Sequence, residues 1–304
     1  MNPAAFRHVM IAAMLSALLA GSAAADCTNL RRVLDAESSE GGKMRAYAPP
    51  SGGALLFLDS MTLDTDGAPK AYHPNDYDPE HPGRCPASGL GLDCPANGGY
   101  PDSGYAFASC PTGNRVPCDA HGFALQGPQD EAPGYLVSAT AFHAEPDYLQ
   151  KNHVDASVVP YVALPGGNVF RDAAISAGVT HILGEIGVAY DRQTKKIVPI
   201  LVGDNSSRIG SRYAHLGEGS IALTRELRGK DNPRNQSISD KNILVVILEG
   251  TPVQKTGELF LGTADGKAAV MKQIAEEADR RLAALGGNDW LSACADTIAA
   301  GGPQ

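Results

Sequence analysis

The stretch KIVPILVGD, residues Lys196 to Asp204, decides the fold class. It is a short run of Val, Ile and Leu that ends at Gly203 and Asp204. Such a run, bounded by turn-forming residues, is typical of a buried strand. Pro199 lies inside the run and cannot donate a backbone hydrogen bond, which indicates an edge or bulged position. The sequence therefore predicts a strand whose last residue is a carboxylate.

Similar apolar runs occur elsewhere in the chain. Only about one to two dozen residues separate several of them, which favours a meander or small barrel over βαβ units. We therefore expect a β-rich α+β fold with a compact β-barrel-like or meander core and a few short helices. The runs are ALLFL (54–58), SVVPYVALPGG (157–167), EIGVAYD (185–191) and NILVVILEGT (242–251).

Three segments have the spacing of amphipathic helices. In CTNLRRVLDAES (27–38), Leu30, Val33 and Leu34 would share one face. EGSIALTRELRG (218–229) would be a short helix that Gly229 ends. Residues 268–287 place apolar side chains on one stripe and charges opposite, which predicts a C-terminal packing helix.

The first 25 residues have the layout of a bacterial secretory signal. Arg7 and His8 precede an apolar run, and small residues up to Ala25 provide a cleavage point. No later run approaches the ~20 apolar residues of a membrane span. We expect a secreted or periplasmic protein, cleaved after Ala25, whose residues 26–304 form one domain without a membrane span.

All six cysteines follow the predicted cleavage site. An even number in an exported chain favours disulfides over metal ligation. Four of them lie in a Pro/Gly-rich stretch, which we interpret as an insertion over residues 85–135, held by disulfides rather than by a core. If these four pair among themselves, Cys27 and Cys294 join the two ends of the chain.

The chain is acidic. Its net charge of −9 becomes −10 when Arg7 leaves with the signal. Nucleic acid and anionic membranes are poor partners for such a surface, whereas a polycation or a neutral polymer is compatible. The alternative is that the acidic surface serves solubility alone. We favour a monomer and expect no binding of nucleic acid.

Two acids bracket a polar loop. Asp204 closes a strand, and Glu218 stands at the start of the predicted helix, so the loop between them can place both acids on opposite sides of one groove. A general base and a general acid so arranged suit inverting glycoside hydrolysis, which needs carboxyl groups ~6.5–9.5 Å apart. The alternatives are that Asp204 caps a turn and that Glu218 compensates the helix dipole.

Asp64 and Asp66 form a second acidic pair in DTDG. They suit an ammonium group of a substrate or a calcium ion, or they are exposed carboxylates of a turn. The calcium-hand pattern is not met, because Gly67 comes too early and no Glu closes the loop. The histidines show no shared metal-ligand spacing, so we predict no metal and no cofactor.

Four segments in this order resemble the fungal-type chitosanases of glycoside hydrolase family 75. The resemblance runs from about Ala54 to Gly229, and its most specific parts are PYVALP and the pair GD…GEGS. The segments are SMTLDTDG, VDASVVPYVALPGG, GEIGVAYD…KIVPILVGDNS and IGSRYAHLGEGSIALTRELRG.

The resemblance implies an endo-acting, inverting hydrolase of β-1,4-linked glucosamine polymer, most of all chitosan. Glu218 would then be the general acid and Asp204 the general base. Asp64, Asp66 and Ser220 would contact substrate; attraction of the two aspartates to protonated 2-amino groups is our own inference.

Two departures keep other functions open. Thr65 stands where the family carries a Cys, and the Cys-rich stretch has no counterpart in it. Alternatives are a muramidase-like hydrolase of peptidoglycan and a non-catalytic carbohydrate-binding protein of the bacterial envelope.

Overall fold

The computed structural model describes residues 27–39, 41–84, 86, 88–113, 115–211, 214–255 and 264–302. The predicted signal peptide, residues 1–25, lies outside them. The strands are β1 (Arg31–Glu37), β2 (Lys43–Ala48), β3 (Ala54–Asp64), β4 (Tyr161–Pro165), β5 (Ile186–Asp191), β6 (Ile197–Ser206), β7 (Glu218–Ser220) and β8 (Ser237–Leu248).

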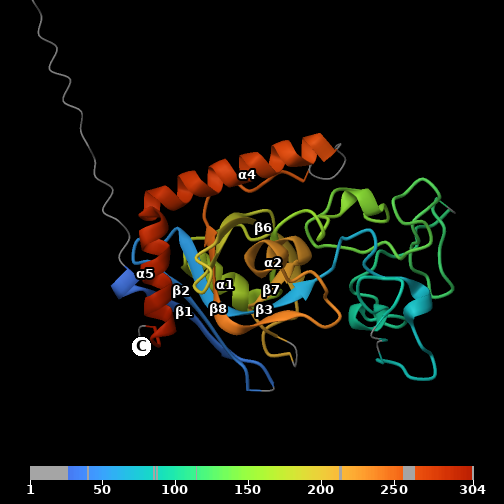
Figure 1. Ribbon diagram of the computed structural model, residues 1–304, viewed down its shortest axis with the longest axis horizontal. Coiled ribbons are helices and arrows are strands. Elements are labelled where there is room, and N and C mark those ends of the chain that lie inside the picture. Colours follow the sequence, from blue (N-terminus) through green and yellow to red (C-terminus); the bar gives the residue numbers. More distant parts are fainter. Residues whose placement is uncertain are drawn as a thin grey trace, which may run out of the picture.

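Six of these strands close into a barrel, in the order β3, β7, β4, β6, β5, β8 and back to β3 (Figure 1). Two neighbouring pairs, β3 with β7 and β4 with β6, are parallel, and the other pairs are antiparallel. β1 and β2 extend the sheet from β3. The prediction of a barrel is confirmed. A meander is excluded, because a meander has only antiparallel pairs of strands and this sheet has two parallel pairs.

Both faces of the central strands are buried. Along β3, Leu55 and Phe57 join one apolar cluster with residues of α1 (Asn168–Ser176) and α2 (Ile221–Arg228). Ala54 and Leu56 join another with residues of α4 (Ala264–Leu285) and α5 (Gly287–Ala299). Burial on both faces explains why the strands read as continuous apolar runs instead of alternating ones.

The C-terminal helix predicted over residues 268–287 corresponds to α4, which begins four residues earlier and ends at Leu285. α5 was not predicted. The chain turns sharply between the two helices (Figure 1), at Gly286 and Gly287, both of which have positive φ. Arg281 attaches α4 to the barrel by donating hydrogen bonds to Glu185 and to the carbonyl of Leu248.

The predicted helix over residues 27–38 is wrong. A short 3-10 turn, η1 (Cys27–Asn29), leads into strand β1, which pairs with β2. A shift of register between Arg32 and Leu34 turns Leu34 inward, so that Leu30 and Leu34 are both buried four residues apart. A bulged strand thus has the spacing of a helix face.

The long segment between β3 and β4, residues 65–160, is here called the excursion, and the predicted insertion 85–135 lies within it. A disulfide joins Cys27 to Cys294, as predicted. Another joins Cys110 to Cys118, which are two of the four inner cysteines, and Cys94 is also disulfide-bonded. The expectation that this segment lacks a core is wrong. It contains 3-10 turns η2 (Pro74–Asp76), η3 (Pro95–Gly98) and η4 (Gln150–Asn152), and buried residues Tyr72, Tyr100, Phe107, Phe123 and Leu136 pack together against the barrel.

Among the described residues, no helix combines the length and the apolar character needed to cross a membrane.

Candidate active site

Asp204 and Glu218 are placed by the same residue of the barrel. Ala163 in β4 pairs with Asp204 of β6 on one side and with Glu218 of β7 on the other. Two strand spacings separate the acids, which corresponds to roughly 10 Å between their Cα atoms. The structure therefore brings together the two acids that the sequence singled out, and backbone ladders set their separation.

The glycines beside these acids lie in or next to strands and allow close packing. A Cβ on Gly203 would lie 2.7 Å from the ring of Tyr161, and one on Gly217 would lie 1.6 Å from the carbonyl oxygen of Ser60. Gly203 is also the extra residue where the β4–β6 register shifts. Such positions exclude any side chain.

The positions of the two acids differ from both structural alternatives. Asp204 lies inside β6, two residues before its end, so it does not cap a turn that ends the strand. Glu218 lies in β7 and precedes Ser220, the N-cap of α2, so the expectation of a Glu in the first helical turn is wrong.

Asp64 and Asp66 lie beside this pair. Asp64 ends β3, and its Oδ1 accepts a hydrogen bond of 2.8 Å from the backbone N–H of Asp66. Gly67 completes the turn with a φ of 81°. Tyr72 donates its hydroxyl to Asp66 Oδ1 at 2.7 Å. Asp64 is only 6% exposed and Asp66 is half-buried, so the alternative of exposed turn carboxylates is wrong.

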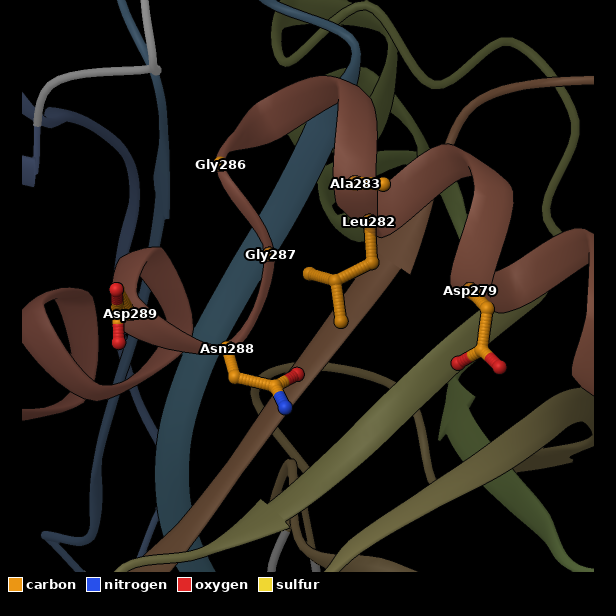
Figure 2. A pocket seen from close by; sticks show the side chains of 7 residues that line it. All are labelled: Asp279, Leu282, Ala283, Gly286, Gly287, Asn288 and Asp289. Carbon is orange, nitrogen blue, oxygen red and sulfur yellow. The ribbon is translucent and has the colours of Figure 1, made fainter.

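All four acids line one cavity of about 820 Å³, together with residues of the excursion. Arg208 and His215 also line it, and the ring of His215 contacts the Thr62 hydroxyl. A cavity of about 460 Å³ lies at the corner between α4 and α5 (Figure 2). Asp279 of α4 and Asp289 of α5 are among the residues that line it, and we assign it no role.

The carboxyl groups in the large cavity hold their protons more tightly than usual. Burial raises the pKa of Asp64 to about 6. Burial, followed by the negative charges of Asp64 and Asp204, raises the pKa of Glu218 well above its ordinary value. Burial and Asp64 do the same to the pKa of Asp204, and burial with both neighbouring aspartates raises that of Asp66.

Hydrogen bonds distinguish the two candidate catalytic acids. Asp204 Oδ1 accepts backbone N–H groups of Ala141 at 2.8 Å and Asn205 at 2.7 Å, and these bonds oppose the rise of its pKa. Among the described residues, Glu218 has no such donor. Asp204 is therefore the more readily ionised of the two, and Glu218 the better proton donor.

Ser220 was predicted to contact substrate. It is fully buried, and its Oγ accepts hydrogen bonds from the backbone N–H groups of Tyr161 and Leu223 while donating to the carbonyl of Val159. Ser220 therefore joins β7, α2 and the start of β4, and we leave it out of the proposed substrate contacts.

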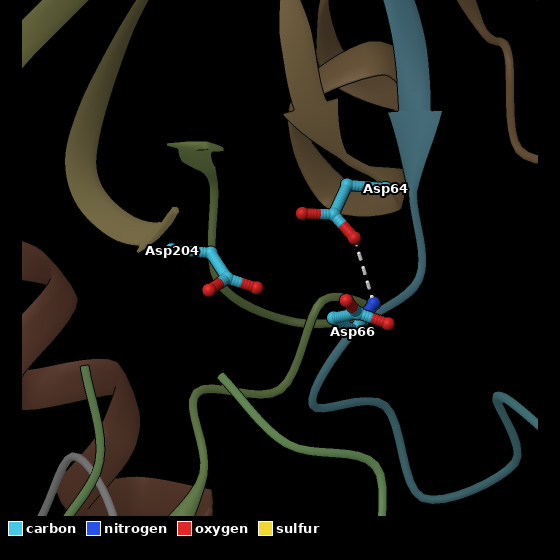
Figure 3. Close-up of side chains that lie close together, drawn as sticks. All are labelled: Asp64, Asp66 and Asp204. Atoms are coloured by element: carbon cyan, nitrogen blue, oxygen red, sulfur yellow. Dashed lines mark hydrogen bonds between the residues drawn. The ribbon is translucent and has the colours of Figure 1, made fainter. Parts of the chain in front are cut away.

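Asp64, Asp66 and Asp204 are the described residues whose geometry suits a metal ion (Figure 3). One carboxylate oxygen from each lies within 4.8 Å of the others, a spacing that a calcium ion can bridge. Burial raises the pKa of each of the three, and the charge of Asp64 adds to this effect at Asp66 and Asp204, so these acids suit shared protons as well as a cation.

Several residues of the cavity were missed by sequence reasoning. Tyr72, Asp93, Asn97 and Tyr105 come from the excursion, as does the backbone N–H of Ala141. These positions have no periodicity. The only local signals are an acid before Cys94 and isolated aromatic residues between glycines and prolines.

Comparison with models of known protein families gives no match, and comparison with curated proteins gives no significant match.

Proposed function

We propose that this protein is an exported, inverting endo-glycosidase that hydrolyses β-1,4 bonds of an amino-sugar polymer, with chitosan as the preferred substrate. The observation that carries the proposal is the pairing of Ala163 with Asp204 and Glu218, two carboxyl groups that line one cavity and would serve as base and acid. The resemblance to the fungal-type chitosanases assigns the same two residues the same roles.

In the proposed reaction, Glu218 donates its proton to the glycosidic oxygen as the bond from that oxygen to the anomeric carbon breaks. Asp204 accepts a proton from a water molecule whose oxygen bonds to the anomeric carbon from the opposite face. The configuration is therefore inverted. The Cα atoms of Asp204 and Glu218 lie roughly 10 Å apart, which supports a separation of their carboxyl groups that leaves room for that water.

The charge of the cavity supports a cationic polymer. Asp64, Asp66 and Asp93 line it in addition to the catalytic pair. Ammonium groups of glucosamine would compensate these carboxylates, whereas the acetamido groups of peptidoglycan carry no charge. We therefore place chitosan before peptidoglycan. The disulfides fit the oxidising surroundings of an exported protein.

The test is hydrolysis of chitosan and of purified peptidoglycan, side by side, by the wild type, Glu218→Gln and Asp204→Asn. We expect the wild type to release reducing ends from chitosan, and NMR to show that the first product has the inverted anomeric configuration. Each variant should lose at least ~10²-fold in kcat. Thermal unfolding of both variants controls for folding.

Other outcomes separate the alternatives. Cleavage of peptidoglycan alone would indicate a muramidase-like enzyme. Binding of chitosan with no release of reducing ends would indicate a carbohydrate-binding protein. Full activity of Glu218→Gln would refute its role as the acid.

A further inference from the structure

Three residues of the excursion form a hydrogen-bonded chain on the wall of the cavity. The side-chain amide of Asn97 donates to Asp93 Oδ1 at 2.9 Å, and the hydroxyl of Tyr105 donates to the main-chain carbonyl of Asn97. The backbone N–H of Cys94 adds a second hydrogen bond to Asp93 Oδ1, at 2.7 Å. These residues surround the turn η3, where Cys94 is disulfide-bonded.

This chain is connected to the acids at the barrel. Tyr72 pairs with Asp93 through a β-bridge, and the hydroxyl of Tyr72 donates to Asp66. Asp93 is close enough that its charge contributes to the raised pKa of Asp64. The acids and the chain line the same cavity, so a polymer long enough to span it would contact both.

Two features of this chain belong to the lining of the cavity. Tyr105 is 73% exposed although it lines the cavity, and its hydrogen bond to Asn97 fixes the direction of its ring. The second carboxylate oxygen of Asp93, Oδ2, accepts no hydrogen bond from any residue that the structure describes. One wall of the cavity thus carries an exposed aromatic ring and a carboxylate oxygen that are linked through Asn97.

We propose that Tyr105 and Asp93 form a binding subsite for one glucosamine unit of the polymer, next to the catalytic acids. The ring of Tyr105 stacks on the C–H face of the pyranose, whose partial positive charge suits the negative face of the ring. Asp93 Oδ2 accepts a hydrogen bond from the 2-ammonium group. Asn97 acts as a positioning residue for both. The inference rests on the proposed substrate class, and it assigns substrate selection to the excursion.

The test measures binding separately from catalysis. Glucosamine oligosaccharides are titrated calorimetrically into the full chain that carries Glu218→Gln, with and without Tyr105→Ala, Tyr105→Phe or Asp93→Asn. Tyr105→Ala should weaken binding about fivefold, whereas Tyr105→Phe, which keeps the ring face, should change it less than about twofold. Leu90→Ala, which removes an exposed apolar side chain of the excursion outside the cavity, is the matched control and should leave binding unchanged.

The Asp93 contact is tested by the charge of the ligand. Asp93→Asn should weaken binding of glucosamine oligosaccharides about tenfold and leave binding of their N-acetylated counterparts unchanged. An equal loss for both ligands would overturn the ammonium contact, and unaltered binding by Tyr105→Ala would overturn the stacking contact.

The failure of this inference is distinguishable from failure of the proposed function. If the wild type cleaves chitosan but neither variant changes binding, the subsite is refuted and the function stands. If binding depends on Tyr105 and Asp93 but no reducing ends appear, the function is refuted and the subsite stands. If the chain neither binds nor cleaves the polymer, both are refuted.

Discussion

Replacing Asp64 by Asn should make the protein more stable at high pH. The pKa of Asp64 rises from 3.8 to about 6 on folding, chiefly through burial. Because the folded state binds this proton more tightly, the stabilisation is complete below the unfolded pKa and is lost as pH rises through about 6. The full loss corresponds to about 3 kcal/mol. Asn removes the charge, and its side-chain oxygen can still accept the hydrogen bond from the N–H of Asp66.

Urea unfolding of the disulfide-intact protein at pH 4 and pH 8 measures this effect. At pH 8 we expect Asp64→Asn to raise the free energy of unfolding by about 1–3 kcal/mol, and at pH 4 by much less. Asp172→Asn is the control, because the side chain of Asp172 is 70% exposed and its charge lies outside the cavity. An equal change at both pH values, or the same change in Asp172→Asn, would refute the argument that burial of this carboxylate opposes folding.

Three further predictions concern the glycines, the metal question and the terminal disulfide. Gly217→Ala should lower the free energy of unfolding in urea by at least about 3 kcal/mol, because the new Cβ would meet the Ser60 carbonyl oxygen. Gly166→Ala is the control and should lower it by less than about 1 kcal/mol, because the atom nearest to its Cβ would lie 3.7 Å away. Equal losses would contradict the packing argument. EDTA should leave hydrolysis of chitosan unchanged, and loss of activity that calcium restores would show instead that Asp64, Asp66 and Asp204 bind a cation. Replacing Cys27 and Cys294 together by Ser should lower the free energy of unfolding by about 2–5 kcal/mol, because the disulfide closes a span of 267 residues. Thermal unfolding measures the change. An unchanged midpoint temperature would argue against stabilisation by this closure.

The sequence identified the long strands but not their connections. Runs such as residues 243–248 are apolar without interruption because both faces are buried. Parallel pairing of β3 with β7 joins segments more than 150 residues apart, and no local pattern encodes such a contact. β1 was misread because its bulge gives Leu30 and Leu34 a helical spacing.

The site was predictable where acids adjoin strands. Asp204 follows an apolar run, and Glu218 lies between two glycines that packing requires. Asp93 and Tyr105 could not be predicted, because turns and hydrogen bonds in an irregular segment bring them to the cavity. Their positions depend on contacts within the excursion, among them the aromatic cluster that the sequence did not reveal.

The position of Ala163 between the two acids has a consequence for protein engineering. The spacing of Asp204 and Glu218 is built into three hydrogen-bonded strands, whereas Asp93 and Tyr105 belong to a segment outside the barrel. Under the proposed function, Asp93 and Tyr105 can therefore be replaced to accept another sugar without altering the distance that governs stereochemistry. Ala141 is a part of the excursion that such a redesign must keep, because its backbone N–H donates to Asp204.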